Sequence, residues 1–159
     1  MQKYEAPIED IKFLINSVFK INNYSNLDRF KKINPEITSM IFEEASKFAQ
    51  NVLLPLNQPG DLEGCGFNQG NVQTPEGFKE AYKAFIEGGW SSLTFDENYG
   101  GQGLPTIIGV LVSEMIVSTN MAFGMYPGLT QGAYKAIEKI GNSEQKDFYL
   151  PKFSGGKWT

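Results

Sequence analysis

The sequence predicts an all-α protein, a helical bundle of about six helices with at most two short strands. In several segments apolar residues recur every three or four positions, which is the spacing of one helix face. Two segments open with a capping residue, a proline and an acid, Asn34-Pro35-Glu36 and Thr74-Pro75-Glu76, as helix starts do. Residues 106–118 are apolar on nearly all sides and too long for a strand, so we expect a largely buried helix there.

Composition narrows the class of protein. The chain has 159 residues, 41% apolar and 20% charged, which suffices for one globular domain with its own core. Its aromatic content of 13% predicts an aromatic-rich core or, alternatively, an aromatic binding surface. A net charge of -4 with scattered lysines and arginines argues against a nucleic-acid partner. The sequence has no histidine and a single cysteine, Cys65, which excludes Ser-His and Cys-His nucleophiles and argues against a zinc site.

The cysteine count and the absence of targeting segments predict the cellular compartment. One cysteine permits no intrachain disulfide, and the sequence shows no signal peptide, so we expect a cytoplasmic protein. No apolar run reaches the length of a membrane span, because the longest, residues 107–112, is interrupted by Gly109.

The first half of the chain predicts two helices and a loop. Apolar residues at helical spacing run from Pro7 to Lys20. The next helix is expected to begin at Asn34 and to end at Pro55. Residues 56–73 are rich in glycine, proline, asparagine and aspartate, and we expect a loop that wraps the surface or contacts another part of a larger protein.

The second half predicts further helices. One starts at Thr74-Pro75 and stops at Gly88-Gly89. In residues 90–105 the glycines could cradle a phosphate, but the spacing is not G-x-G-x-x-G, so a tight connection with positive φ angles is favoured. After the helix 106–118, residues 120–129 are expected to bend, and helices 130–140 and 144–150 follow, the last capped by Ser143 and closed by Pro151. Residues 157–159 look like the start of an extended segment.

Several stretches resemble acyl-CoA dehydrogenases, and the resemblance covers essentially the whole chain. Residues 89–105, GWSSLTFDENYGGQGLP, resemble the family's "GW…L…P-E-x-Y-G-G-x-G-L" connection, with Asp96 where proline is usual. Residues 141–152, GNSEQKDFYLPK, resemble its "G-x-x-E-Q-K-x-x-Y-L-P-K", and residues 126–133, YPGLTQGA, resemble one subgroup. The opening, Tyr4-Glu5-Ala6-Pro7, is similar to the short N-terminal extension of a subgroup that includes dehydrogenases of 3-(methylthio)propanoyl-CoA.

The resemblance implies a division of the chain and an activity. Residues 1–33 would be the N-terminal extension, 34–155 the family's N-terminal helical domain, and 156–159 the start of a β-domain that this chain lacks, as it lacks the C-terminal helical domain. The implied enzyme uses FAD to oxidise an acyl-CoA to the 2,3-enoyl-CoA, forms a homo-oligomer, and passes electrons to an electron-transferring flavoprotein. In the family the flavin-binding strand and the catalytic carboxylate lie beyond Thr159, so we assign no catalytic, cofactor-binding or metal-binding residue and expect the chain alone to be inactive.

The resemblance also places part of the acyl pocket in this chain. An ungapped register between residues 112–114 and 141–142 puts four residues at the pocket wall, namely Gly124, Met125, Gly128 and Gly132. Small or flexible residues there indicate a roomy site for an apolar tail. Close helix packing through glycine is the other explanation, and both can hold.

Two other interpretations of the chain stay open. It could be the subunit of a split enzyme whose flavin domain and base come from a separate polypeptide, or a non-catalytic helical interaction module. The apolar helix expected at residues 106–118 argues against a free-standing module, because part of its surface would then be exposed to water.

Overall fold

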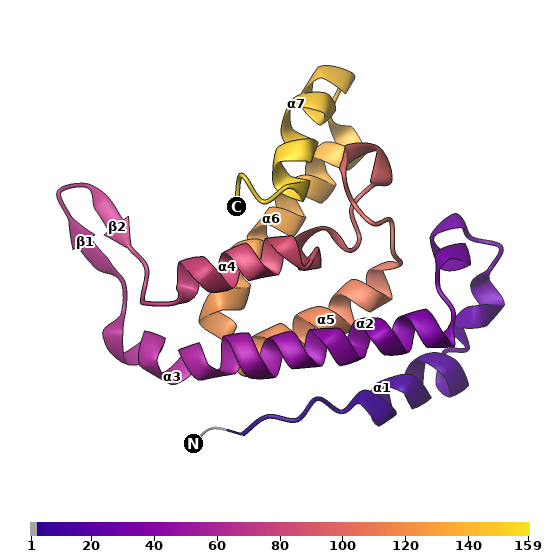
Figure 1. The fold of residues 1–159 in the computed structure, drawn as a ribbon. Coiled ribbons are helices and arrows are strands. Elements are labelled where there is room, and N and C mark those ends of the chain that lie inside the picture. Colours follow the sequence, from indigo (N-terminus) through magenta and orange to yellow (C-terminus); the bar gives the residue numbers. More distant parts are fainter. Residues whose placement is uncertain (1–2) are drawn as a thin grey trace.

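The computed structural model describes residues 3–159, and within that range it contains α-helices and one small hairpin (Figure 1). This confirms the all-α class predicted from the sequence. The hairpin pairs β1 (Gly66–Asn68) with β2 (Asn71–Gln73) in antiparallel register. The helices are α1 (Ile8–Phe13), α2 (Pro35–Phe48), α3 (Leu54–Glu63), α4 (Phe78–Glu87), α5 (Thr106–Thr119), α6 (Met121–Ile140) and α7 (Ser143–Ser154).

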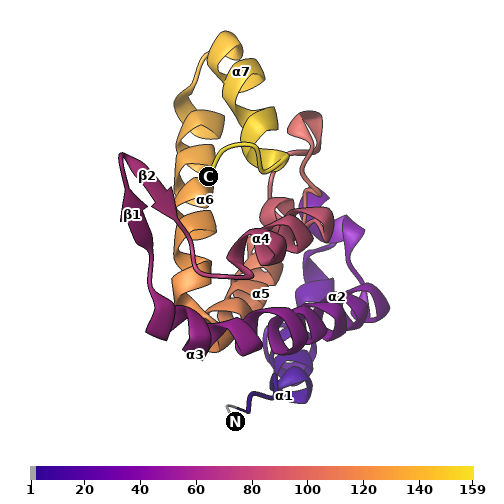
Figure 2. The ribbon, with the colours of Figure 1, turned by 60° about the vertical axis from the view of Figure 1, so that its left-hand side comes forward.

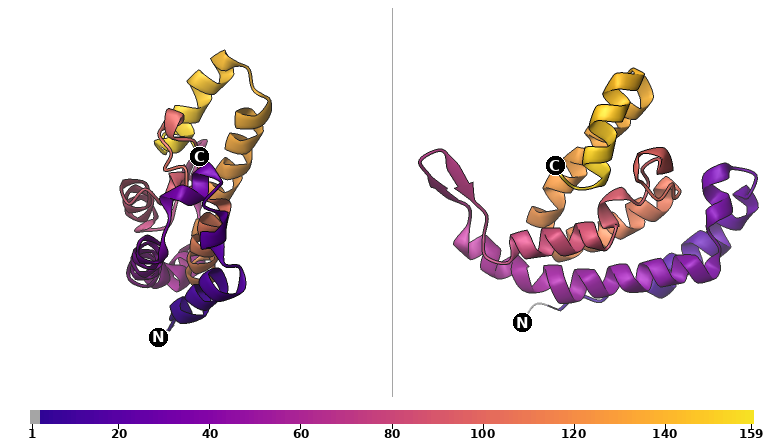
Figure 3. Two further views of the ribbon diagram at one scale, coloured as in Figure 1. Left: turned by 90° about the vertical axis from the view of Figure 1, so that its right-hand side faces the viewer. Right: turned by 45° about the horizontal axis from the view of Figure 1, so that its top comes forward.

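The helices pack around one long rod. α2 and α3 run end to end, with α1 along one side of α2 and α5 along another (Figures 1 and 2). α6 packs on α5 and extends beyond it, and α7 folds back against α6. The hairpin stands away from the bundle, as Figure 3 shows from two further directions.

The long rod differs from the helix that the sequence predicts, which was expected to end at Pro55. The start is as expected: Pro35 occupies the first turn, and the Asn34 side chain accepts a hydrogen bond of 2.8 Å from the Ile37 N–H. At its other end α2 continues through a π-helical turn, Ala49–Leu53, directly into α3. Pro55 lies directly after this π-helical turn, where the hydrogen-bond pattern of the rod changes, and the rod continues past it.

The prediction of a loop at residues 56–73 is also wrong. Its first part belongs to α3 and its last part to the β1–β2 hairpin. Gly60 is buried, and a side chain there would collide with the Phe78 ring, so glycine permits close packing inside a helix instead of breaking it. The turn residues Gln69 and Gly70 both have positive φ, which is typical of a tight hairpin connection.

Three further helix ends differ from the prediction. α4 begins at Phe78 after Gly77, whose φ is 81°, and not at the Thr74-Pro75 pair. α7 is capped by Asn142 rather than Ser143 in a reciprocal capping box with Gln145. It also runs through Pro151 to Ser154.

The largest difference from the prediction concerns α6. Residues 120–129 were expected to form a bend, but nearly all of them belong to this helix. The Asn120 side chain accepts a 2.9 Å hydrogen bond from the Phe123 N–H and so caps α6. Pro127 then lies inside this helix. Its buried residues follow helical spacing, namely Phe123, Pro127, Thr130 and Tyr134. Burial of this face outweighs the local preference of glycine and proline for a turn.

The connection between α4 and α5 is folded tightly on itself. The Gly103 N–H donates to the Phe95 carbonyl and the Leu104 N–H to the Leu93 carbonyl, each at 2.9 Å. Gly100 and Gly103 have φ angles of 84° and 64°, and Gly101 lies directly against the Phe95 backbone. The glycines therefore allow the tight backbone conformation of this connection, as the sequence predicts.

Two groups of buried side chains form the core. The larger lies between α1, α2, α4, α5 and the start of α6. The smaller centres on Phe95, Tyr134 and Leu150, where the Phe95 and Tyr134 rings stack with centroids 3.7 Å apart. The Tyr134 hydroxyl also accepts a 3.0 Å hydrogen bond from the Asp96 N–H, which ties the connection to α6. Within residues 3–159 no helix has the length and apolar character needed to cross a membrane.

Candidate functional site

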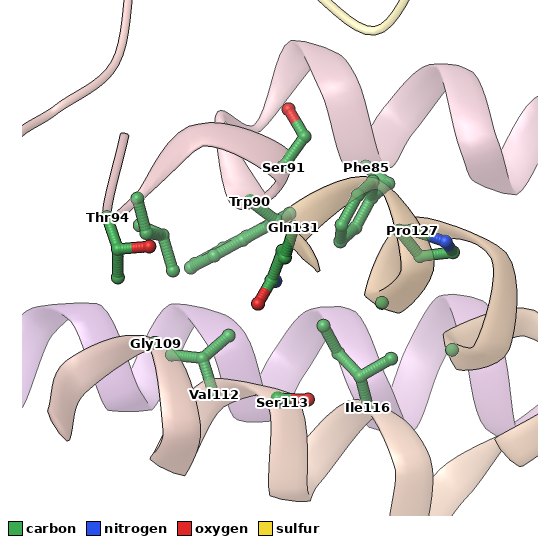
Figure 4. Close-up of a pocket in the computed structure, with 13 residues that line it drawn as sticks. Phe85, Trp90, Ser91, Thr94, Gly109, Val112, Ser113, Ile116, Pro127 and Gln131 are labelled. Carbon is green, nitrogen blue, oxygen red and sulfur yellow. The ribbon is translucent and has the colours of Figure 1, made fainter. Parts of the chain in front are cut away.

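A hollow lies where α5 and α6 meet the segment that follows α4 (Figure 4). Its cavity volume is about 30 Å³, room for about one water-sized group, within about 430 Å³ of non-atom space that includes open solvent. The residues that line it are Phe85, Trp90, Ser91, Leu93, Thr94, Gly109, Val112, Ser113, Ile116, Gly124, Pro127, Gly128 and Gln131.

The walls of the hollow combine aromatic and aliphatic side chains with four uncharged polar ones, namely Ser91, Thr94, Ser113 and Gln131. Phe85 and Trp90 form one side in Figure 4, and Val112 and Ile116 of α5 form the side facing them. Trp90 is stacked on Phe48 of α2 with centroids 6.2 Å apart, so the aromatic side is anchored in the core. No charged side chain is among the lining residues that the structure describes. Such a surface suits an uncharged, largely apolar ligand group.

The structure divides the four residues predicted at the pocket wall into two pairs. Gly124 and Gly128 line the hollow. Met125 has 64% of its surface exposed, and Gly132 is exposed as well, so neither lines the hollow. A contact between Met125 or Gly132 and a substrate stays a prediction.

Gly124 and Gly128 play different parts. A Cβ atom at Gly124 would lie 3.0 Å from Cγ2 of Val117, so this glycine lets α6 approach α5 closely. A Cβ atom at Gly128 would meet nothing within 4 Å, so this glycine leaves volume free. Close helix packing therefore accounts for Gly124, and a role of Gly128 as a roomy wall of an acyl pocket stays a prediction.

Sequence reasoning did not find the α5 side of the hollow or Gln131. The signal was present, because Gly109, Val112, Ser113 and Ile116 share one face of a helix by their spacing of three and four. Gln131 follows Gly124 and Gly128 on α6 in the same way. The expected bend at residues 120–129 concealed that relation.

The N-terminal extension reaches the rim of the hollow. Arg29 donates a 2.6 Å hydrogen bond from Nη1 to the carbonyl of Thr94, a lining residue. Its Nη2 lies 3.6 Å from Oε1 of Glu138 on α6, an ion pair too long for a hydrogen bond. Lys32 forms an ion pair with Glu97 in the connection. Ile11, Ile15, Ile21 and Ile33 of the extension are buried in the larger core.

The titratable groups with shifted pKa values do not form an acid–base site at the hollow. Burial raises the pKa of Tyr126 to about 12, with smaller contributions from Tyr82 and Cys65. Burial also raises the pKa of Tyr134, although its hydrogen bond with Asp96 lowers it in part. Neither tyrosine lines the hollow, nor does any carboxylate in the described range, so we assign no general base.

The hollow does not fit a flavin nucleotide. A pyrophosphate needs cationic side chains or free backbone N–H groups, as at a helix N-terminus. Among the described residues that line the hollow none is lysine or arginine, and the α5 and α6 residues there come from helix interiors. No cluster of three potential metal ligands occurs in residues 3–159 either. The arrangement can bind and orient an uncharged chain, but it supplies no redox chemistry.

Comparison with known proteins gives a consistent result. The family model described as the acyl-CoA dehydrogenase N-terminal domain matches residues 35–157. A 3-methylmercaptopropionyl-CoA dehydrogenase of Ruegeria pomeroyi is 36% identical over 98% of this chain and 26% of its own length. A butyryl-CoA dehydrogenase of Syntrophomonas wolfei is 29% identical over 99% of this chain, again 26% of the relative. The chain thus spans about a quarter of the curated relatives it matches.

A solved structure supports the same fold. It is described as the electron transferring flavoprotein of Acidaminococcus fermentans, in a study of flavin-based electron bifurcation. The TM-score is 0.58 at 22% identity, over 75% of this chain and 29% of the other. At that identity the likeness concerns the fold alone.

Proposed function

Because this chain belongs to the acyl-CoA dehydrogenase family and forms its N-terminal helical domain, we propose that it is part of an FAD-dependent enzyme that oxidises an acyl-CoA to the 2,3-enoyl-CoA. Its share of the work is to bind the acyl tail. The observation that carries this proposal is the uncharged hollow between α5 and α6, which Gly128 leaves open. The tail of an acyl thioester is an uncharged chain of the kind such walls accept.

The chemistry itself falls to residues outside this chain. Removal of the α-proton needs a base within hydrogen-bond reach, and the hydride from the β-carbon needs an acceptor, which a bound flavin supplies. The described hollow offers neither a base nor a flavin site. What these residues do is fix the tail, because a tail held in one place holds the reacting carbons in one place as well.

The outward face of α6 supports a larger enzyme over a free-standing module. Apolar side chains with most of their surface exposed recur along this helix, namely Met121, Met125, Leu129 and Ile140. Their spacing places them on a common side, and a contiguous apolar surface of that kind is typical of an interface. We propose that the β-domain and the C-terminal helical domain cover it, either in one polypeptide or from a separate chain as in a split enzyme.

The partners of the whole protein rest on family membership. We propose a homo-oligomer in the cytoplasm that passes electrons to an electron-transferring flavoprotein. Substrates as small as the 3-methylmercaptopropionyl and butyryl groups named for the relatives, or longer ones, are candidates.

A single substitution tests the proposed tail site. In the full-length enzyme Gly128→Leu adds four carbon atoms where a Cβ atom meets nothing within 4 Å, so the fold should be kept. Acyl-CoAs whose tails reach the hollow should lose roughly 10- to 200-fold in kcat/KM, because each excluded methylene contact is worth about 1–3 kcal/mol. The shortest acyl-CoAs should lose little.

Ala122→Leu is the matched control, since Ala122 is exposed on α6 and does not line the hollow. It should leave the chain-length profile unchanged. An equal loss for every chain length in Gly128→Leu, with an unchanged melting temperature, would remove this stretch from the tail site.

A further inference from the structure

Gln131 and Ser113 are two of the four polar side chains that line the hollow, beside Ser91 and Thr94. The Gln131 side chain of α6 extends into the space between the aromatic side and α5, and Ser113 lies on the α5 side (Figure 4). Both residues are partly buried. A tail entering between α5 and α6 would meet both of them.

Neither group has a protein partner. Among residues 3–159 the Gln131 amide and the Ser113 hydroxyl make no hydrogen bond to side chain or backbone, whereas Ser91, also a lining residue, donates to the Ser154 carbonyl at 3.4 Å. Solvent reaches both groups, because neither is among the fully buried side-chain atoms without a partner. A tail that fills the hollow displaces that water, and an amide then left without a partner costs free energy. A ligand that supplies the partner removes that cost.

We propose that Gln131, assisted by Ser113, selects acyl groups whose tail carries a neutral hydrogen-bonding atom; this rests on the proposed function of the hollow as the tail site. The amide can both donate and accept, so an ether, hydroxyl or keto oxygen is a suitable partner, and a thioether sulfur is a weaker one. The tail is neutral because the described lining residues include no charge to compensate an ionic group.

The alternative is an all-carbon tail, and it predicts the opposite preference. An apolar tail would press against an amide that it cannot satisfy, so leucine in place of Gln131 should improve its binding. A neutral hydrogen bond contributes modestly, and its loss should change relative rates by roughly 2- to 12-fold. The contact lies away from the reacting carbons, so it should act mainly on KM.

The experiment uses the full-length enzyme and pairs of acyl-CoAs of equal length. One member is all-carbon, and the other has one methylene replaced by oxygen, at position 5 or beyond so that the α- and β-carbons are undisturbed. The quantity measured is the ratio of kcat/KM for the two members as the oxygen is moved along the tail. The variants are Gln131→Leu, Gln131→Met, Ser113→Ala and, as control, Gln58→Leu, because Gln58 is exposed on α3 away from the hollow.

We expect wild type to favour the oxygen analogue at one position along the tail. At that position Gln131→Leu and Gln131→Met should lower the ratio roughly 2- to 12-fold, mainly through KM, Ser113→Ala should lower it less, and Gln58→Leu should leave it unchanged. The proposal is overturned if both Gln131 variants show the wild-type ratio at every oxygen position while they retain activity on all-carbon substrates. A wild-type enzyme that oxidises no acyl-CoA overturns the proposed function itself, so the two failures are distinguishable.

Discussion

Replacing Arg29 by methionine should destabilise the chain by removing a clamp between the N-terminal extension and the rim of the hollow. Arg29 donates at 2.6 Å to the Thr94 carbonyl, and Thr94 is 8% exposed. A hydrogen bond from a charged donor contributes about 1.5–3 kcal/mol. The pair with Glu138 at 3.6 Å is partly exposed, with side chains 39% and 22% accessible, so it adds no more than about 1 kcal/mol. Methionine keeps most of the packing of the arginine stem.

The expected loss of unfolding free energy is therefore about 2–3 kcal/mol. For a chain of this size each kcal/mol lowers Tm by roughly 2–4 °C, so Tm should fall by about 4–12 °C. Thermal unfolding of the 159-residue chain, followed by circular dichroism at 222 nm, measures this.

Lys31→Met provides the comparison for Arg29→Met. Lys31 pairs with Asp28 three residues away, and both side chains are mostly exposed, at 59% and 93%. Its loss should leave Tm nearly unchanged. If Arg29→Met and Lys31→Met melt within 1 °C of each other, the clamp does not contribute as the geometry indicates.

Three further outcomes are expected. Gly101→Ala should cost more than about 2 kcal/mol in a urea titration, because its Cβ atom would collide with the Phe95 backbone, and a cost under 0.5 kcal/mol would show that the connection yields easily. Burial raises the pKa of Tyr126 to about 12 from 10.0, so the folded chain keeps this proton where the unfolded chain loses it. The stabilisation is fully present below pH 10 and is lost as pH rises to 12. Tyr126→Phe should flatten the decline of Tm over that range, and an unaltered slope would place the effect elsewhere. The chain titrated with FAD should leave flavin fluorescence and absorbance unchanged, and stoichiometric yellow protein would contradict this.

Much of the fold could be predicted because the residues that recur at helical spacing in the sequence are largely the ones that the structure buries. In α5 the apolar residues on nearly all sides predict a largely buried helix, and the structure buries Ile108, Val112 and Met115 among them. The start of α2 was equally plain, because Asn34 and Pro35 each favour a helix start for an independent reason.

The helix boundaries misplaced at prolines share one physical cause. At Pro55, Pro127 and Pro151 the local preference for a break competes with burial of a continuous helical face, and burial is larger. A single sequence shows the local preference directly but shows burial only through partners elsewhere in the chain. Gly124 illustrates this, because its reason for being glycine is Val117 on the neighbouring helix.

For the candidate site, the sequence could place Gly124 and Gly128 through a family resemblance but not Gln131. A family resemblance identifies only the positions that members of the family share. Whether the Gln131 amide has a partner depends on the side chains that surround it in three dimensions, and that is visible in the packed structure alone.

The Arg29 clamp also constrains the order in which a ribosome-bound chain can fold. Glu138 lies 109 positions after Arg29, and Thr94 lies 65 after it. At about 5–20 residues per second, synthesis reaches Glu138 roughly 5–20 s after Arg29. During that interval the apolar residues of the extension, such as Ile11 and Ile15, have no finished core to enter. This segment is therefore synthesised before its partners and is among the last parts of the described chain to dock.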